Sequence, residues 1–194
     1  MRRAFRSLLV FATVAASVLA TAGTGQAAPS PGRSDFSDTA PTDLPSASGM
    51  QASVALGACV RAHVAGYGWQ KEWACNNLHH TGTVGQNRAI EALQIWISGA
   101  GRFCAKAHTR NHGWDKNETC ANGEQVATVG TTGMARPMQA VRVTMQSNTG
   151  TERADGWSHI QETGRLYHPT VGQEAILDTI GRARNLEAVS IGIS

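Results

Sequence analysis

The sequence predicts an all-β domain with pseudo-threefold symmetry, in which three repeats of roughly 45 residues form a β-trefoil or β-prism arrangement. A block of cysteine, tryptophan and cysteine occurs twice at a constant spacing of 45 residues: Cys59, Trp69 and Cys75, then Cys104, Trp114 and Cys120. Each copy ends in strictly alternating aliphatic residues, which is typical of a half-buried strand. Such units favour a closed domain, because each unit buries its apolar face against the other two.

Two segments are expected before the domain. Residues 1–28 are predicted to be a secretory signal peptide, because arginines near the start precede an apolar run from Leu8 to Leu19 and then small residues. Residues 29–51 are rich in Pro, Ser, Thr and Gly, and they predict a disordered linker. We therefore expect a secreted, extracellular protein. No membrane span is expected in the mature chain, because the apolar run is shorter than the about 20 residues that a span needs.

The three repeats are assigned to about 59–98, 103–146 and 154–194 of a domain that spans residues 52–194. The third copy is degenerate, since it has no cysteine and carries Arg165 where the tryptophan is expected. A unit that lacks both features but keeps its glycine turn and aliphatic strand is held together by its strands. The cysteines of the other two copies are then additional staples.

The strands follow from aligned sets of residues. The second strand of each copy is predicted from Leu93, Ile95 and Ile97; Val141, Val143 and Met145; and Val189, Ile191 and Ile193. Residues 87–97 alone would also fit an amphipathic helix, and the other copies decide for a strand. An earlier strand of the first copy is predicted from the alternation of Val60, Ala62 and Val64. The Gly-Thr-x-Gly motifs at residues 82–85 and 130–133 predict tight turns in which glycine adopts a positive φ.

Four cysteines in a secreted chain allow three pairings, and the repeat favours equivalent pairs in each copy. We therefore expect the disulfides Cys59–Cys75 and Cys104–Cys120. The alternative is a zinc site with ligands from the first repeat: Cys59, His63, Cys75 and His79 or His80. An oxidising compartment disfavours that site, and the second repeat has no counterpart of its last two ligands. No metal and no cofactor are expected.

These motifs resemble the clostridial hydrophobic repeats with conserved tryptophan, called ChW repeats. In the first copy the resemblance rests on His63, Gly68, Trp69, Gly82, Thr83, Gly85, Arg88, Glu91 and Ala92. The second copy has Gln139 in place of the glutamate, and the third lacks the tryptophan. The resemblance implies a secreted or surface protein of Gram-positive bacteria that acts in adhesion or in binding polysaccharide or protein. It implies no defined catalytic centre, and the cysteine pairs depart from the usual repeat.

Composition narrows the function further. The formal net charge is +3 without a long basic run, which argues against nucleic acid as a partner. No Gly-x-Ser-x-Gly motif occurs, and the acidic residues that could pair for glycoside hydrolysis are of a kind found on any surface: Glu72, Asp115, Glu162 and Asp178. We therefore expect no enzyme. The leading hypothesis is a noncatalytic module that binds a cell-envelope or environmental glycan. The alternative is an extracellular protein-interaction, adhesion or structural module, so the expected partner is a polysaccharide or a surface protein.

The candidate ligand-binding residues are aromatic. Trp69 and Trp114 suit either a core anchor or a platform on which a sugar stacks, and the core is favoured. Trp96, Trp73 and Trp157 have no counterparts in the other copies, which makes them the better candidates for surface recognition.

Histidines and charged residues also recur. His63, His108 and His159 could line a threefold site, although an imidazole bonded to a turn backbone is the favoured interpretation. Recurring arginines precede two glutamates by three residues and predict contacts at the surface or rim: Arg88 with Glu91, and Arg184 with Glu187, whereas Arg136 precedes Gln139. The alternative is that the three arginines form a threefold carboxylate-binding site.

Overall fold

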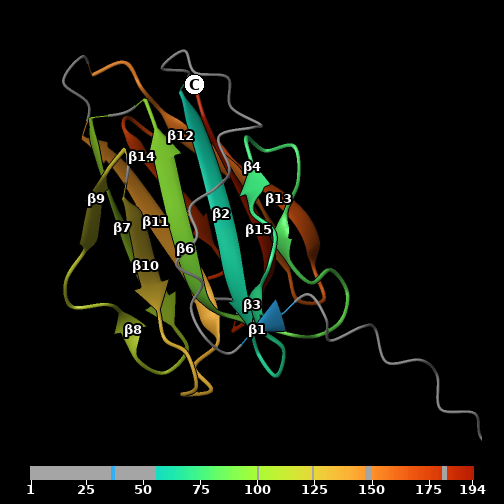
Figure 1. Cartoon of the computed structure of the whole chain (residues 1–194). Coiled ribbons are helices and arrows are strands. Elements are labelled where there is room, and N and C mark those ends of the chain that lie inside the picture. Colours follow the sequence, from blue (N-terminus) through green and yellow to red (C-terminus); the bar gives the residue numbers. More distant parts are fainter. Residues whose placement is uncertain (1–35, 38–55, 100, 124, 147–149, 181–182) are drawn as a thin grey trace, which may run out of the picture. The chain divides into compact units, whose positions relative to one another are not determined.

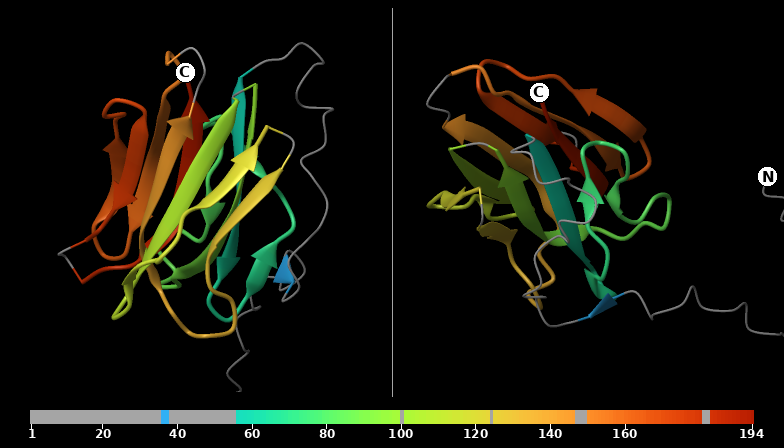
Figure 2. Two further views of the ribbon diagram at one scale, coloured as in Figure 1. Left: turned by 90° about the vertical axis from the view of Figure 1, so that its left-hand side faces the viewer. Right: turned by 45° about the horizontal axis from the view of Figure 1, so that its top comes forward.

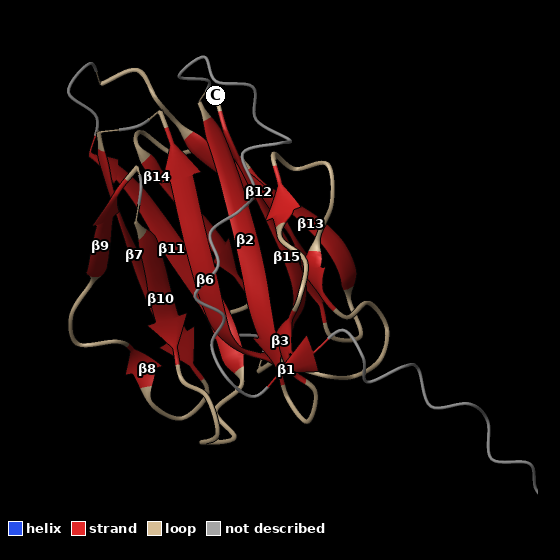
Figure 3. Ribbon diagram, in the orientation of Figure 1, coloured by secondary structure: helices blue, strands red, loops and turns tan. Residues whose placement is uncertain are grey.

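Strands account for all the regular structure that was found. The computed structural model describes residues 36–37, 56–99, 101–123, 125–146, 150–180 and 183–194 (Figure 1). Within these ranges the chain forms fifteen strands in three antiparallel sheets and no helix (Figure 3). The all-β class predicted from the sequence is therefore confirmed.

Each repeat is organised around one long antiparallel pair of strands. The pairs are β2 (Gly57–Val64) with β6 (Ile90–Ser98), β7 (Arg102–Thr109) with β11 (Met138–Gln146), and β12 (Ala154–Ile160) with β15 (Leu186–Ile193). The second strand of each pair holds the alternating aliphatic residues that predicted it. The helical alternative for residues 87–97 is thereby excluded.

After the first strand of each pair, the chain turns back and pairs with that strand again, and we call this segment the return strand. The repeats differ in whether the return strand is continuous. The first repeat has two short return strands, β3 (Gly68–Gln70) and β4 (Ala74–Cys75), and the second has β8 (Gly113–Trp114) and β9 (Thr119–Asn122). The third has one continuous strand, β13 (Gly164–His168), with all five residues paired to β12. Along β2, His63 lies four positions after Cys59, but their partners Trp69 and Cys75 are six positions apart. The two extra residues interrupt the ladder, and the disulfide closes it again.

The remaining strand of each repeat crosses to the neighbouring repeat. The crossing strands are β5 (Thr81–Gly82), which pairs with β15; β10 (Val126–Gly130), which pairs with β6; and β14 (Glu174–Asp178), which pairs with β11. Each repeat thus lends a strand to the repeat before it, and the first lends its strand to the third. This cyclic exchange ties the three sheets together.

Backbone hydrogen bonds repeat at each exchange. The amides of Thr83, Thr131 and Thr179 donate to the carbonyls of Glu187, Glu91 and Gln139, at 2.8, 2.9 and 2.8 Å. Just before the first two threonines lie Gly82 and Gly130, with φ of 106° and 83°. A Cβ at Gly82 would lie 2.1 Å from the Glu187 carbonyl oxygen. Glycine is therefore required both by the turn, as predicted, and by the close approach of the next repeat.

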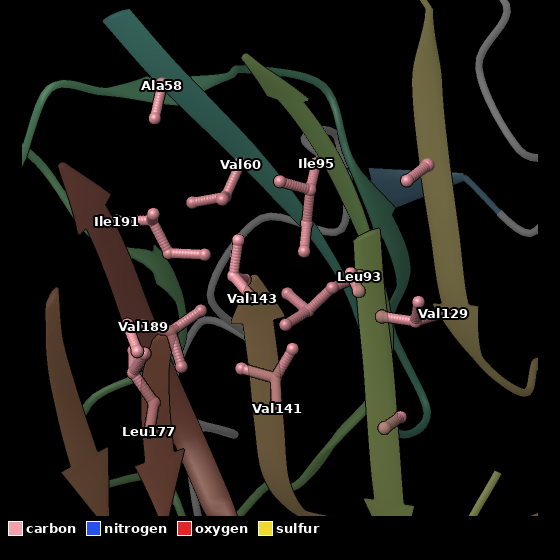
Figure 4. Close-up of a cluster of buried hydrophobic side chains, with 14 of the residues drawn as sticks. Ala58, Val60, Leu93, Ile95, Val129, Val141, Val143, Leu177, Val189 and Ile191 are labelled. Carbon is pink, nitrogen blue, oxygen red and sulfur yellow. The ribbon is translucent and has the colours of Figure 1, made fainter. Parts of the chain in front are cut away.

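The apolar core lies between the three sheets. Figure 2 shows the strands of the third repeat, coloured orange to red, across the interior from β2 and β6. Aliphatic side chains from the sheets point toward one another there (Figure 4), including Val60, Leu93, Ile95, Val143, Leu177 and Ile191, all of which are buried. Burial of each such side chain contributes about 1.5–3 kcal/mol, so the core supplies the main stabilisation.

The strict alternation predicted for β2 is not seen in its burial. All eight residues of β2 are buried, including Arg61 and His63 on its outer face. The segment after Gly68 covers this face: the guanidinium of Arg61 lies 4.4 Å from the Trp73 ring centroid and donates to the Lys71 carbonyl at 3.3 Å. The alternation of residue types was correct, but the disulfide-bonded return segment covers the face expected to be exposed.

The segments expected before the domain are largely outside the described residues. Within the predicted linker, β1 (Phe36–Ser37) pairs with β3. The described residues belong to one compact unit, and the predicted signal peptide lies outside them. No described helix could cross a membrane.

Candidate ligand-binding site

A pocket of about 300 Å³ lies where the first repeat packs on the third, and we call it the Trp157 pocket. Residues of β12 and β15 form one side, with Arg165 of β13 beside them. The loop between β4 and β5 and the following turn close the other side. The lining residues are Asn77, Leu78, His79, His80, Val84, Trp157, Ser158, His159, Arg165, Ala188, Val189 and Ser190.

The loop of the first repeat is anchored at its start. Asn76 and Asn77 adopt φ of 54° and 58°, a left-handed conformation that asparagine tolerates better than most residues. Asn76 exchanges two hydrogen bonds with Ala58: its amide donates at 2.8 Å, and its side-chain oxygen accepts at 3.0 Å. Because Cys75 precedes Asn76 and Cys59 follows Ala58, the first disulfide holds the residues from which the pocket loop begins.

The same loop is fixed to the third repeat by Asn77. Its side-chain amide donates to Asp155 Oδ1 at 2.7 Å. A Cβ at Gly192 would lie 2.2 Å from the Asn77 side-chain nitrogen. Any residue other than glycine at this position of β15 would therefore clash with the Asn77 side chain. Gly192 occupies the place that Trp96 has in the first repeat, which explains why the third repeat has no tryptophan there.

The turn after β5 is held by a buried carboxylate. Glu187 Oε2 accepts a hydrogen bond from the Gly85 amide at 3.2 Å and lies 3.1 Å from His159 Nδ1. Glu187 is 2% exposed, so burial of its charge is compensated by these two partners. Both sides of the pocket are therefore held in place without a ligand.

Trp157 is flanked by two residues of β13. It pairs directly with Tyr167 in the β12–β13 ladder, and the two ring centroids are 4.7 Å apart. The Arg165 guanidinium lies 4.1 Å from the Trp157 ring centroid. This distance is typical of a cation–π contact. The Trp157 ring and the Arg165 guanidinium stacked on it therefore line the pocket together.

The third repeat rearranges a pair that the other two repeats share. His63 is directly opposite Trp69, and His108 is opposite Trp114, with edge-on ring contacts at centroid distances of 5.4 and 5.3 Å. In the third repeat His159 is opposite Arg165. The indole is instead contributed by Trp157, two residues before the histidine.

The ionisable side chains that line the pocket are an arginine and three histidines. Arg165 and His80 are exposed, and His79 is beside them in the loop. Partial burial lowers the pKa of His80, and the nearby Arg165, His159 and His79 lower it further. None of the residues lining this pocket is acidic. The site thus gathers basic side chains around one aromatic ring.

The other tryptophans are placed differently. Trp69 is 1% exposed, as the core interpretation predicts, whereas Trp114 is half-buried. Trp73 and Trp96, the other candidates for surface recognition, are half-buried with their indole nitrogens covered, and neither lines the Trp157 pocket. Of the three tryptophans without counterparts, the structure brings Trp157 alone to this pocket.

The three recurring histidines do not form a common site. They lie on β2, β7 and β12 in three different sheets. His63 Nδ1 lies 3.3 Å from Glu91 Oε2, which matches the His159–Glu187 pair, and the second repeat has Gln139 at that place. These carboxylate partners were not foreseen from the sequence.

The expected arginine–glutamate contacts at the rim are wrong for both glutamates. Glu91 and Glu187 are buried and face histidines. Arg88 and Arg184 instead donate to the backbone carbonyls of Ala65 and Gln161, at 3.2 and 3.0 Å. These arginines hold equivalent hairpin turns in the first and third repeats.

A buried serine–histidine pair also escaped the sequence analysis. Ser158 Oγ lies 2.7 Å from His168 Nε2 across the β12–β13 ladder. Burial lowers the pKa of His168, while Asp178 and a hydrogen bond to the backbone of Ile176 oppose that shift. Ser158 is 1% exposed, although it is among the residues that line the Trp157 pocket. The pair is a hydrogen bond within the fold.

Both expected disulfides, Cys59–Cys75 and Cys104–Cys120, are present. Each joins residues that are directly opposite in adjacent strands. One group with metal-ligand geometry was found in the described ranges, Cys104 and Cys120 with Glu118, but its two sulfurs are bonded to each other. The cysteines therefore serve as cross-links.

The first repeat, from β2 to β6, carries the tryptophan, glycine turn and buried glutamate that define the arrangement. Residues 63–99 match the family model described as Clostridial hydrophobic W. This ChW match confirms the resemblance stated from the sequence of the first copy. It begins at His63 and includes Trp69, the glycine turn and Glu91. No curated protein and no solved structure is significantly similar to the chain.

Proposed function

We propose that the domain is a secreted, noncatalytic binding module that recognises a glycan of the cell envelope or the environment through the Trp157 pocket. The observation that carries the proposal is the pocket itself. It combines an aromatic ring with convergent polar groups on a prearranged scaffold, and its volume of about 300 Å³ is at the lower end for ligand sites. Such a site suits one residue or terminus of a saccharide.

The position of the pocket supports a binding role. It forms where the third repeat departs from the other two, since Trp157 and Arg165 have no equivalents in the same places. The exchanged strands, which support the fold, recur in all three copies. The combination of Trp157 and Arg165 beside a pocket belongs to the third copy.

Two further proposals accompany this function. Secretion is supported by two disulfides, which persist in oxidising compartments. A prism-type fold is supported over a trefoil by three separate sheets, each centred on one repeat's long pair and joined by the cyclic exchange of β5, β10 and β14.

An alternative is a protein partner at the edge of the third sheet. β13 is an edge strand, and its Leu166 and Tyr167 are 37% and 42% exposed. An exposed edge with apolar side chains can receive an added strand from another protein. This alternative predicts binding that survives loss of the Trp157 indole.

Retention of the purified domain on a polysaccharide panel and on purified bacterial cell wall tests the proposal. We expect at least one glycan to retain the domain and to change its tryptophan fluorescence. The change should disappear in Trp157→Phe, because the other four tryptophans lie outside the pocket. If no polysaccharide or wall preparation retains the domain, the glycan proposal fails, and a protein captured through β13 becomes the better account.

A further inference from the structure

We infer that the ligand of the Trp157 pocket carries an anionic group, a carboxylate, phosphate or sulfate, that is bound by Arg165 and the pocket histidines. The inference rests on the proposed function, because it assigns the chemistry of the saccharide that the same pocket would take. It is drawn from the charges around the pocket and from which of them already have partners.

The guanidinium of Arg165 is oriented but not neutralised. Its plane is supported by the Trp157 ring at 4.1 Å from the centroid. Among the described residues, no hydrogen bond or ion pair engages its N–H groups. An arginine stacked on an aromatic ring keeps its N–H edges available for a bidentate contact with a carboxylate or phosphate. Ordering by the indole reduces the entropy that such a contact would otherwise lose.

Two acidic residues contact residues that line the pocket, and both already have hydrogen-bond partners. Asp155 accepts from the Asn77 amide at 2.7 Å and from the Tyr167 hydroxyl at 2.9 Å. Glu187 is buried and engages His159 and the Gly85 amide. Neither carboxylate belongs to the pocket lining. Of the basic side chains that line the pocket, His159 is thus paired with Glu187, whereas neither carboxylate engages Arg165, His79 or His80.

The histidines add a dependence on pH. His79 and His80 come from the loop of the first repeat, while His159 and Arg165 face them from the third. Burial and the nearby Arg165 hold the pKa of His80 below its ordinary value, and a bound anion favours the protonated imidazole. Binding should therefore take up a proton, so affinity for the anionic ligand should rise as the pH falls toward the lowered pKa of His80.

Matched polymers separate charge from saccharide shape. The probes are polygalacturonic acid against its methyl ester, and dextran sulfate against dextran, each tested with the mature domain at constant ionic strength. We expect at least one acidic polymer to bind at least about tenfold more tightly than its neutral counterpart, consistent with a charge-assisted hydrogen bond. Binding should tighten between pH 7.5 and 5.5, and His79→Gln/His80→Gln should reduce that change.

A matched charge variant excludes general attraction. Arg165→Gln and Arg102→Gln each remove one positive charge, and Arg102 is exposed at the start of β7 in another sheet. We expect Arg165→Gln to weaken binding of the acidic polymer by about tenfold or more and Arg102→Gln by less than about twofold. Equal losses for the two variants would overturn the inference, because they indicate nonspecific electrostatics.

The inference and the proposed function fail in different ways. Equal binding of acidic and neutral polymers with continued dependence on Trp157 overturns the anionic ligand and leaves the glycan function intact. Absence of binding to every polysaccharide and wall preparation overturns the glycan function, and the inference with it.

Discussion

The Arg165 guanidinium lies 4.1 Å from the centroid of the Trp157 indole. In this pair the tryptophan lies on the first strand of the repeat and the arginine in the segment that follows, which is the reverse of the first repeat. There the residue two positions before the histidine is Arg61, whose guanidinium lies 4.4 Å from the Trp73 ring. Arg61 is 1% exposed and bonded to Gln94, whereas Arg165 is exposed beside a pocket. The same chemical pair thus closes the outer face of one sheet and lines a pocket on another.

The two disulfides should have separable effects. Removing either pair, as Cys59→Ala/Cys75→Ala or Cys104→Ala/Cys120→Ala, should lower the free energy of unfolding by about 3 kcal/mol, because each closes a short loop. The first pair should also weaken ligand binding, since Cys75 precedes Asn76 and Asn77 in the pocket loop. Urea denaturation and retention on the bound glycan measure the two effects. Equal affinity losses in both double variants would contradict the role of the first disulfide.

Two glycines of one turn should differ in their tolerance of a side chain. Gly82→Ala should lower the free energy of unfolding by more than about 3 kcal/mol, because its Cβ would lie 2.1 Å from the Glu187 carbonyl oxygen. Gly85→Ala is the control: it shares a positive φ, but its Cβ would meet nothing within 4 Å. Its effect should stay near the about 1–2 kcal/mol of a left-handed alanine. Similar losses in urea denaturation would argue against the exchange contact.

The buried His168 should make stability depend on pH. Its folded pKa lies below the ordinary value of 6.5, mainly because burial disfavours the charged ring. The unfolded chain therefore binds more protons in this range, and stability present above pH 6.5 is lost as the pH falls through the folded pKa. The loss should not exceed about 1.4 kcal/mol per pH unit for one group. His168→Gln should flatten this part of the profile in chemical denaturation between pH 7.5 and 5. An unchanged slope would contradict the assignment to His168.

Local patterns were enough to predict much of the fold. Alternating aliphatics such as Leu93, Ile95 and Ile97 identified the second strand, and equivalent cysteines identified both disulfides. The glycine turns at residues 82–85 and 130–133 also follow from local chemistry. These features depend on residues close in sequence or on comparison between copies, so a single sequence contains their signal.

The exchange of strands between repeats had no such signal. β5 is two residues long, and its partner β15 is about a hundred residues later in the chain. The burial of Glu91 and Glu187 depends on the same exchange, because the glycine turn of the next repeat covers them. A prediction from the sequence of each repeat alone therefore places both glutamates at the rim.

The pocket likewise depends on contacts between distant segments. Trp157 was among the candidates because it breaks the threefold pattern, but Trp73 and Trp96 satisfied the same criterion. The contact of Asn77 with Asp155, between residues 78 positions apart, holds the loop of the first repeat to the third repeat, where Trp157 lines the pocket. In the sequence, Arg165 stands where the tryptophan of the third repeat was expected. Its contact with Trp157 depends on the register of β13 on β12.

The most direct test of the central claim compares one indole inside the pocket with one apolar side chain outside it. The measurement is the affinity of wild type, Trp157→Ala and Val171→Ala for the polysaccharide that retains the domain, after thermal unfolding has established that each variant is folded. Val171 is 79% exposed and lies outside the Trp157 pocket. We expect Trp157→Ala to weaken binding by at least about tenfold and Val171→Ala by less than about twofold. Unchanged affinity of folded Trp157→Ala would contradict the assignment of the binding site.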